Sequence, residues 1–369
     1  MQRRSTGITV LAVLGLLYTL YFAREFLLPI TFAVLLDFLL SPAVRALARR
    51  HVPRPLAAGL VLVGLFGVAG LAVYDLAGPV QSWATNAPES ISKAQGRLRR
   101  LLQPIQRVSN TAEQVENAAG GVAGTDKSSV VVVRGPSFMS RLFGSTQRFL
   151  AGALEVIILL FFLLAAGDLF LQKLIKVLPN LRDRRKAIEI ARETEASVST
   201  YLLTMAAVNL VEGAIVAAAM FALGMPNALL WGALVVLLEF VPYLGALAAV
   251  IVLSVAALAT FDDLGHALLV PGSYLGINLI QANLVGPLLL GHRLELNPVA
   301  IFVSLAFWFW IWGIAGAFIA VPLLAAFKIF CDHIESLASV GEFLGRRDRS
   351  PLVSASLPAS PPPARTPAD

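Results

Sequence analysis

The sequence is poor in the residues that build catalytic and metal centres. Among its 369 residues, one is cysteine and four are histidine. A single thiol excludes a disulfide framework and a cysteine-built metal cluster, and the four histidines are scattered without ligand spacing. The chain also lacks a nucleophile elbow, a phosphate-binding glycine loop and an HExxH motif. We therefore predict no metal site, no cofactor and no enzymatic activity.

Charge is scarce as well. Charged residues make up 14% of the chain, against about 25% in an average soluble domain. Hydrophobic residues make up 57%, and the mean hydropathy is +0.76. A soluble fold could not cover so much apolar surface, so we predict an all-α polytopic membrane protein with about eight membrane segments. We attribute the net charge of +6 to basic cytoplasmic loops. The expected partner of the protein is therefore the lipid bilayer and not nucleic acid.

The N-terminal third contains three apolar runs, at 7–23, 26–40 and about 56–77. The first two are predicted to form a tight pair of spans. The loop before the third run, RALARRHVPRP, carries four arginines and no acidic residue. Short basic loops stay in the cytoplasm, so both termini are predicted to be cytoplasmic.

The rest of the chain changes composition several times. A polar stretch follows the third run, and its residues 87–119 have a helical pattern. The first two predicted units are a three-span membrane unit (1–77) and an extracytoplasmic polar region (78–148). The third (149–200) contains a fourth span at 149–166 and a cytoplasmic amphipathic helix at 173–196. A transport core (201–335), which begins with a fifth span at about 201–223, and a disordered proline-rich cytoplasmic tail (336–369) complete the chain.

Two apolar runs, 228–260 and 298–330, are too long for simple spans. As a straight helix, each would measure about 50 Å against a hydrocarbon core of about 30 Å. The first is interrupted by EFVPYLG and the second around WGIAGA, where proline and glycine favour a break. Each run is therefore either one long tilted span or a hairpin. The hairpin interpretation agrees better with the positive-inside rule. It places the acidic pair at 262–263 outside and the link 291–296, which contains Arg293, in the cytoplasm.

Ionisable residues inside membrane spans are costly and therefore tend to be functional. Glu239 lies in the middle of the first long run, directly before the predicted break at Pro242. A break frees backbone groups that must line a cavity or be buried in protein. A carboxylate there is suited to bind a cation, a proton or a polar solute; the alternative is that it only caps the broken helix end or pairs with a basic group.

Further polar side chains interrupt the neighbouring spans. Asn209 and Glu212 share one helix face, as do Asn278 and Gln281, whereas Asn283 points elsewhere. These residues either line a common cavity or hold helices together by hydrogen bonds. Two pairs with small-xxx-small spacing predict close helix packing: Gly213 with Ala217, and Gly316 with Ala320.

Two blocks of the chain resemble the autoinducer-2 exporter family. The first is ALGMPNALLWGALVVLLEFVPYLGALAAVI, and the second is QANLVGPLLLGHRLELNPVAIFVSLAFWFWIWGIAGAFIAVPLLAAFK. The matching positions are Gly224, Pro226, Glu239, Pro242, Tyr243 and Gly245 in the first block, and Asn283, Pro287, Gly291, Pro298, Gly313, Gly316, Pro322 and Lys328 in the second. The chain departs from the family at Gln281 and Ala282, where relatives commonly have a Glu-Asn pair.

The resemblance implies a multi-pass transporter of the bacterial inner membrane that assembles as a homo-oligomer. We expect a secondary transporter that exports a small polar solute, such as an autoinducer-2-like signal, through a site at the broken helices. One alternative is a cation/proton antiporter that uses Glu239. The other is a non-transporting scaffold that acts through residues 78–148. The expected solute- or ion-binding residues are Glu239, Pro242, Tyr243, Gly245, Asn209, Glu212, Asn278, Gln281 and Asn283.

Overall fold

The computed structural model describes residues 2–117, 138–167, 181–285 and 296–345, together with a few positions between 168 and 180. Within these ranges the protein is built of helices and turns. The β-structure in these ranges is a single isolated bridge between Leu296 and Gly345. Four helices are long and apolar enough to cross a membrane: Arg24–Ala48, Arg54–Trp83, Arg184–Ala222 and Pro298–Asp332. Four shorter apolar helices accompany them. The predicted all-α membrane fold is thus confirmed.

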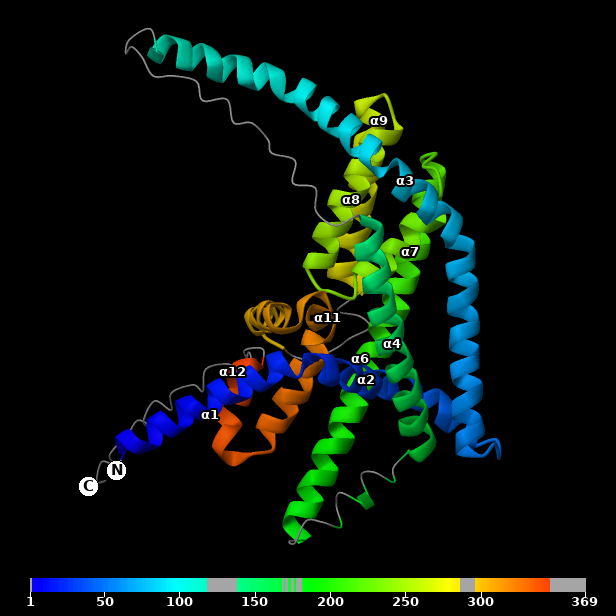
Figure 1. The fold of residues 1–369 in the computed structure, drawn as a ribbon, viewed down its shortest axis with the longest axis vertical. Helices are drawn as coiled ribbons and strands as arrows, with labels where there is room; N and C mark the ends of the chain where they lie inside the picture. Colours follow the sequence, from blue (N-terminus) through cyan, green and yellow to red (C-terminus); the bar gives the residue numbers. More distant parts are fainter. Residues whose placement is uncertain are drawn as a thin grey trace, which may run out of the picture.

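The first two helices lie end to end. Helix α1 (Gln2–Phe22) is separated from α2 (Arg24–Ala48) by Ala23 alone, and Figure 1 shows the two following one another across the molecule. They do not form the tight pair that the sequence predicts, since one residue between helices is too short for a reversal of the chain. Helix α2 packs against α4 and α6.

Two predicted boundaries are absent. Helix α3 (Arg54–Asn117) continues through the expected span end at 77 into the polar region, although it contains Gly78 and Pro79. Figure 1 shows its second half turning over the end of the molecule where α8 and α9 meet and then projecting away. Helix α6 (Leu181–Ala222) joins most of the predicted amphipathic helix and the fifth span into one continuous helix. Apolar periodicity marks which face of a helix is buried, and it does not mark where the helix stops.

Helix α4 (Phe138–Ala166) contains the predicted fourth span. It packs against α2 and α3 through a cluster of buried aliphatic side chains that includes Ala33, Ala57, Leu160 and Leu164. The contacts among the helices do not depend on which side of the membrane a loop faces, so the extracytoplasmic position of 78–148 stays a prediction.

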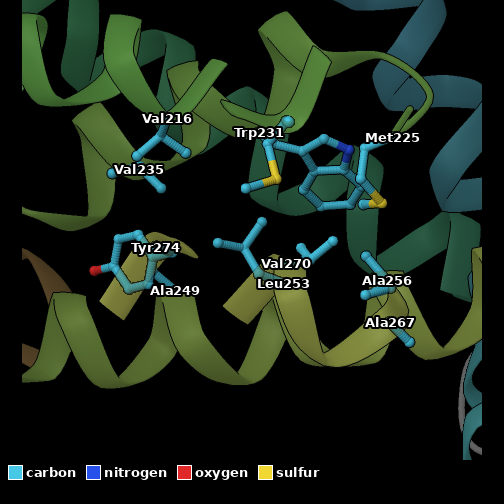
Figure 2. Close-up of a cluster of buried hydrophobic side chains, with 12 residues drawn as sticks. Val216, Met225, Trp231, Val235, Ala249, Leu253, Ala256, Ala267, Val270 and Tyr274 are labelled. Carbon is cyan, nitrogen blue, oxygen red and sulfur yellow. The ribbon is translucent and has the colours of Figure 1, made fainter. Parts of the chain in front are cut away.

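The first long apolar run folds back on itself. Helices α7 (Ala228–Leu238) and α8 (Leu244–Thr260) are separated at the predicted break, and α9 (Leu264–Ile280) and a π-helical turn (Gln281–Val285) follow. The imidazole Nε2 of His266 lies 2.8 Å from the carbonyl oxygen of Leu223, so the end of the run returns to its beginning. Apolar side chains from α6, α7, α8 and α9 fill the space between them (Figure 2). The run is a hairpin.

The second long run also reverses. Helix α11 (Pro298–Asp332) contains a non-helical residue, Gly313, with φ 64° and ψ −146°. The Ser304 hydroxyl donates to the carbonyl oxygen of Ala320 at 3.0 Å. In a straight helix these two residues would be about 24 Å apart. Gly316 lies so close to the carbonyl oxygen of Trp308 that a Cβ atom there would overlap it. The second run is therefore also a hairpin.

The closed end of the first hairpin packs against the second hairpin near the middle of the molecule (Figure 1). Val241, in the break between α7 and α8, is buried against Leu305, Ala317 and Ala320 of α11. Nearby, the rings of Phe240 and Phe318 stack with centroids 6.4 Å apart. One side of the break is therefore packed against α11, while Tyr243 of the break and Leu244 at the start of α8 are exposed.

The C-terminal segment differs from the prediction at its start. A 3-10 turn (Glu335–Leu337) and helix α12 (Ala338–Leu344) occupy positions expected to be disordered, and α12 packs on α11. The backbone N–H of Asn297 donates to the carbonyl oxygen of Leu344 at 2.9 Å. This bond attaches the C-terminal segment to the start of α11. The predictions for 291–295 and for the proline-rich residues 346–369 lie outside the described residues.

Candidate functional site

Small residues bring two site-bearing helices together. A Cβ atom on Gly213 of α6 would lie 2.7 Å from the carbonyl oxygen of Gly232 on α7, and one on Gly232 would lie 2.7 Å from the Cβ of Ala217. These contacts confirm the close packing that the Gly213–Ala217 spacing predicts. They also hold Glu212, which adjoins Gly213, beside the helix that ends at Glu239.

Glu239 occupies the C-cap position of α7 and is buried. A carboxylate at a helix C-terminus faces the negative end of the helix dipole, so this is an unfavourable position for a residue with only a capping role. Its side chain instead turns to α9, where Oε1 accepts a hydrogen bond from the Tyr274 hydroxyl at 2.5 Å. The interpretation of Glu239 as a helix cap is therefore not supported.

Asn278 connects two carboxylates. Its amide nitrogen donates to Glu212 Oε1 and to Glu239 Oε1, each at 3.1 Å. Because both oxygens lie within hydrogen-bonding distance of one nitrogen, the carboxylates of α6 and α7 are close neighbours. An amide nitrogen has two hydrogens, so both of its donors are used.

Tyr274 completes the hydrogen-bonded cluster. Its ring is fully buried in the apolar core between α7, α8 and α9. Figure 2 shows the hydroxyl at the edge of that core, directed away from the apolar side chains. The same residue thus packs in the core and donates to Glu239.

Part of the site has no hydrogen-bond partner. Both amide atoms of Asn209 and the second carboxylate oxygen of Glu212, Oε2, are buried and unpaired. A buried polar group without a partner costs about 1–3 kcal/mol, and a charged one costs more. These unpaired atoms are free to bind hydrogen-bond donors or acceptors from outside the cluster.

The motif residues of the break shape the backbone and do not line the cluster. Pro242 follows the end of α7 at Leu238 and has no N–H that could continue the helix. Tyr243 has a positive φ of 63°, which is rare for a residue with a side chain. Tyr243 points outward, with 56% of its surface exposed. Gly245 approaches the carbonyl oxygen of Leu238 too closely for any Cβ atom. The three residues fix the turn that positions Glu239.

The structure assembles four of the predicted polar residues and leaves out two. Asn209 and Glu212 lie on one face of α6, and Asn278 and Glu239 meet Glu212. Asn283 is exposed and donates to the carbonyl oxygen of Leu279 at 2.8 Å, and Gln281 makes no hydrogen bond to the cluster. Sequence reasoning missed Tyr274, which lies one turn before Asn278 on α9.

The chemistry of the cluster follows from its charges. The hydrogen-bond partners of Glu212 and Glu239 among the described residues are neutral. Two carboxylates held together in an apolar surrounding repel each other unless a proton, a cation or the donors of a solute compensate them. The site is therefore suited to take up positive charge or hydrogen-bond donors.

Two reversed helix hairpins, the first of which carries a buried polar site at its break, are typical of a membrane protein of the transporter type. Comparison with known families agrees: residues 10–336 match the model of the AI-2E family transporter. The chain belongs to this family, which confirms the resemblance seen in the sequence.

Several curated relatives cover nearly the whole chain. The AI-2 transport protein TqsA of Escherichia coli is 26% identical over 92% of this chain and 96% of its own length. A putative transport protein of Haemophilus influenzae is also 26% identical, with the same coverage. A putative transport protein of Mycobacterium tuberculosis is 28% identical over 86% of this chain and 85% of its own length. The family is thus one of transport proteins.

Proposed function

We propose that this protein is a secondary transporter that moves a small polar solute through the cluster of Glu212, Glu239, Tyr274 and Asn278. The observation that carries the proposal is the pair of buried carboxylates at the break of a membrane-embedded hairpin, joined by one amide. Interrupted helices with polar groups at the membrane centre are the usual form of a transport site.

The name of one relative supports a class of solute. Because a 26% identical protein is described as an AI-2 transport protein, we propose outward transport of an autoinducer-2-like signal or a related small metabolite. The carboxylates and the unpaired amide of Asn209 supply acceptors and a donor for such a solute.

Cation/proton antiport is a second proposal, and one observation favours it. Glu212 and Glu239 have only neutral hydrogen-bond partners among the described residues, so an exchanged proton or cation would balance their charge. In this proposal Glu239 is the exchanging carboxylate.

The test is transport by the purified protein in sealed proteoliposomes. Labelled small polar solutes, autoinducer-2 among them, are screened with and without a sodium or proton gradient. Solute movement that needs the protein supports the first proposal, and a pH-sensitive dye that responds to added sodium supports the second. If neither solute nor protons move in any condition, the proposal of transport is wrong and a scaffold role through residues 78–148 takes its place.

We further propose that the protein is a homo-oligomer of the bacterial inner membrane with both ends of the chain in the cytoplasm. The arginine-rich loop at 45–54 supports this orientation. The faces of α3 and α4 that lie beside each other offer apolar side chains to lipid or to another copy. Light scattering of the detergent-solubilised protein, corrected for bound detergent, distinguishes a monomer from an oligomer.

A further inference from the structure

We propose that the groove between α3 and α4, together with the arginine-rich turn at its end, is a binding site for one anionic phospholipid. The headgroup binds at the turn, and one acyl chain lies in the groove. The site is separate from the polar cluster of α6, α7 and α9. The inference therefore goes beyond the proposed transport function and does not depend on it.

The groove is open and apolar. It has a volume of about 810 Å³ and is lined by glycine, aliphatic and phenylalanine residues of α3 and α4. Gly59 and Gly67 belong to its α3 wall, and Phe161 and Phe162 belong to its α4 wall. A Cβ atom on either glycine would meet nothing within 4 Å, so the missing side chains leave space for a ligand. The eight residues from Gly59 to Gly67 span about 12 Å of helix, which suits a stretch of extended hydrocarbon chain.

The turn between α2 and α3 lies at one end of this groove. Helix α3 begins at Arg54, five residues before Gly59, so the groove starts about 8 Å along the helix from the turn. Helix α4 ends at Ala166. The residue after it, Gly167, lies so close to the Arg54 guanidinium that a Cβ atom there would overlap it. The ends of both groove helices are therefore together at the arginine-rich turn.

The turn has positive charge that suits a phosphate group. Arg49 and Arg50 are exposed, and neither forms an ion pair with another described residue. Arg45, one turn earlier on α2, is instead paired with Glu195 of α6. The segment RALARRHVPRP contains no acidic residue that could neutralise the two arginines. Guanidinium groups match phosphate oxygens with paired hydrogen bonds, and basic clusters beside membrane helices attract anionic lipids.

The two features identify the ligand only in combination. The positive-inside rule alone accounts for arginines at a helix end, and an apolar groove alone accepts an acyl chain or a helix of another copy. An anionic phospholipid fits both, because its phosphate lies at the membrane surface and its hydrocarbon begins a few ångströms deeper. A helix of a second copy would fill the groove and leave Arg49 and Arg50 without a negative partner.

The experiment is native mass spectrometry of the purified full-length protein, which counts the lipid molecules that stay bound when detergent is removed. The protein is titrated with dioleoyl phosphatidylglycerol or dioleoyl phosphatidylethanolamine, which share their acyl chains and differ in headgroup charge. Arg49→Gln combined with Arg50→Gln tests the headgroup position. Arg24→Gln combined with Lys93→Gln is the control, because it also removes two positive charges, at the start of α2 and in the second half of α3.

A second pair of variants tests the groove. Gly59→Leu combined with Gly67→Leu fills it, and leucine is a better helix former than glycine. Gly64→Leu combined with Gly70→Leu is the matched control. These two glycines lie on the same helix and also have open space at their Cβ positions, but they do not line the groove.

We expect the wild type and both control variants to bind phosphatidylglycerol about tenfold or more tightly than phosphatidylethanolamine. The arginine variant should lose this preference, and the groove variant should bind both lipids about tenfold more weakly. If the groove variant does not fold, the arginine variant decides.

Equal binding of the two lipids by the wild type overturns the site, as does an unchanged preference in the arginine variant or an unchanged affinity in the groove variant. Loss of a dimer or larger oligomer in the groove variant, with lipid binding unaltered, also overturns it and assigns the groove to a second copy. Because the readout is lipid binding, these results hold whether or not the protein transports a solute.

Discussion

At the scale of single residues, Asn278 and Tyr274 decide the geometry of the site. Asn278 spaces two carboxylates that would otherwise repel each other, and Tyr274 holds Glu239 from within the apolar core. Hydrogen bonds to charged groups contribute about 1.5–3 kcal/mol each. Removing one of them should therefore alter function more than it alters the fold.

Tyr274→Phe tests the contribution of the hydroxyl. The phenyl ring still fills the core, while Glu239 loses the hydroxyl donor at 2.5 Å and keeps the Asn278 amide. We expect a fall of about tenfold or more in transport or in apparent affinity, with the thermal unfolding midpoint little changed. The measurement is initial transport rate in proteoliposomes, with Tyr74→Phe, an exposed tyrosine of α3, as the control. A variant as active as the wild type would show that the hydroxyl is dispensable.

The residues that sequence reasoning found and missed differ in a physical way. Glu239, Glu212, Asn209 and Asn278 were predictable because polar groups are costly inside a membrane. Tyr274 was not, because its ring is compatible with an apolar span and its hydroxyl gives no signal until its partner is known. The separation of Asn278 from Gln281 was also hidden, since both lie on one face of an ideal helix and the π-helical turn begins at Gln281.

At the scale of elements, each hairpin has a glycine at which a Cβ atom would overlap the facing backbone. Gly245 touches the carbonyl oxygen of Leu238 across the first break, and Gly316 touches that of Trp308 across the second. The breaks themselves were predictable from proline and glycine. The continuity of α3 and α6 was not, because the sequence at their expected boundaries still permits a helix.

Gly245→Ala should destabilise the first hairpin. A methyl group there overlaps the backbone of α7, and overpacking of this kind costs about 1–3 kcal/mol. We expect a lower thermal unfolding midpoint and impaired transport. Gly272→Ala in α9 has open space around its Cβ position and should be neutral or slightly stabilising. Equal midpoints for Gly245→Ala and the wild type would contradict the tight turn.

A cross-link tests the second hairpin. In a Cys331→Ser background, the pair Ser304→Cys and Ala320→Cys should react with a short bifunctional thiol reagent, because Ser304 Oγ lies 3.0 Å from the Ala320 carbonyl oxygen. Mass spectrometry of the digested protein detects the linked peptides, and the two single-cysteine variants are the controls. A long straight span would place the two positions about 24 Å apart, so failure to cross-link despite labelling of both thiols would count against the hairpin.

At the scale of the whole molecule, the hairpins give the polar site its place. The contact of His266 with Leu223 holds the open end of the first hairpin together, and the contact of Asn297 with Leu344 does so for the second. Val241, at the closed end of the first hairpin, packs against the arms of the second. The polar extension of α3 contacts the first hairpin through Trp83, whose ring lies edge-on to that of Trp231 with centroids 5.8 Å apart. The extension therefore packs against the hairpin that carries Glu239.

The orientation of the chain is testable at the link between the long runs. We expect residues 291–296 to face the cytoplasm, because Arg293 then lies inside and Asp262 and Asp263 outside. A cysteine at His292 in the Cys331→Ser background should resist a membrane-impermeant thiol reagent added to intact cells and react after permeabilisation. A cysteine at Asp262 is the control for outside labelling. Rapid reaction at position 292 in intact cells would reverse the orientation.

The most direct test of the central claim, that the buried carboxylates form the transport site, is transport by Glu239→Gln. Glutamine keeps the shape and an acceptor for Tyr274 and Asn278, but it cannot carry charge or exchange a proton. We expect transport to fall about a hundredfold or more and its pH dependence to disappear, while Glu155→Gln, an exposed carboxylate of α4, behaves as the wild type. Comparable rates for the wild type and Glu239→Gln over a pH range of about 5.5 to 8.5, at equal abundance in the membrane, would contradict the account and return Glu239 to a structural role.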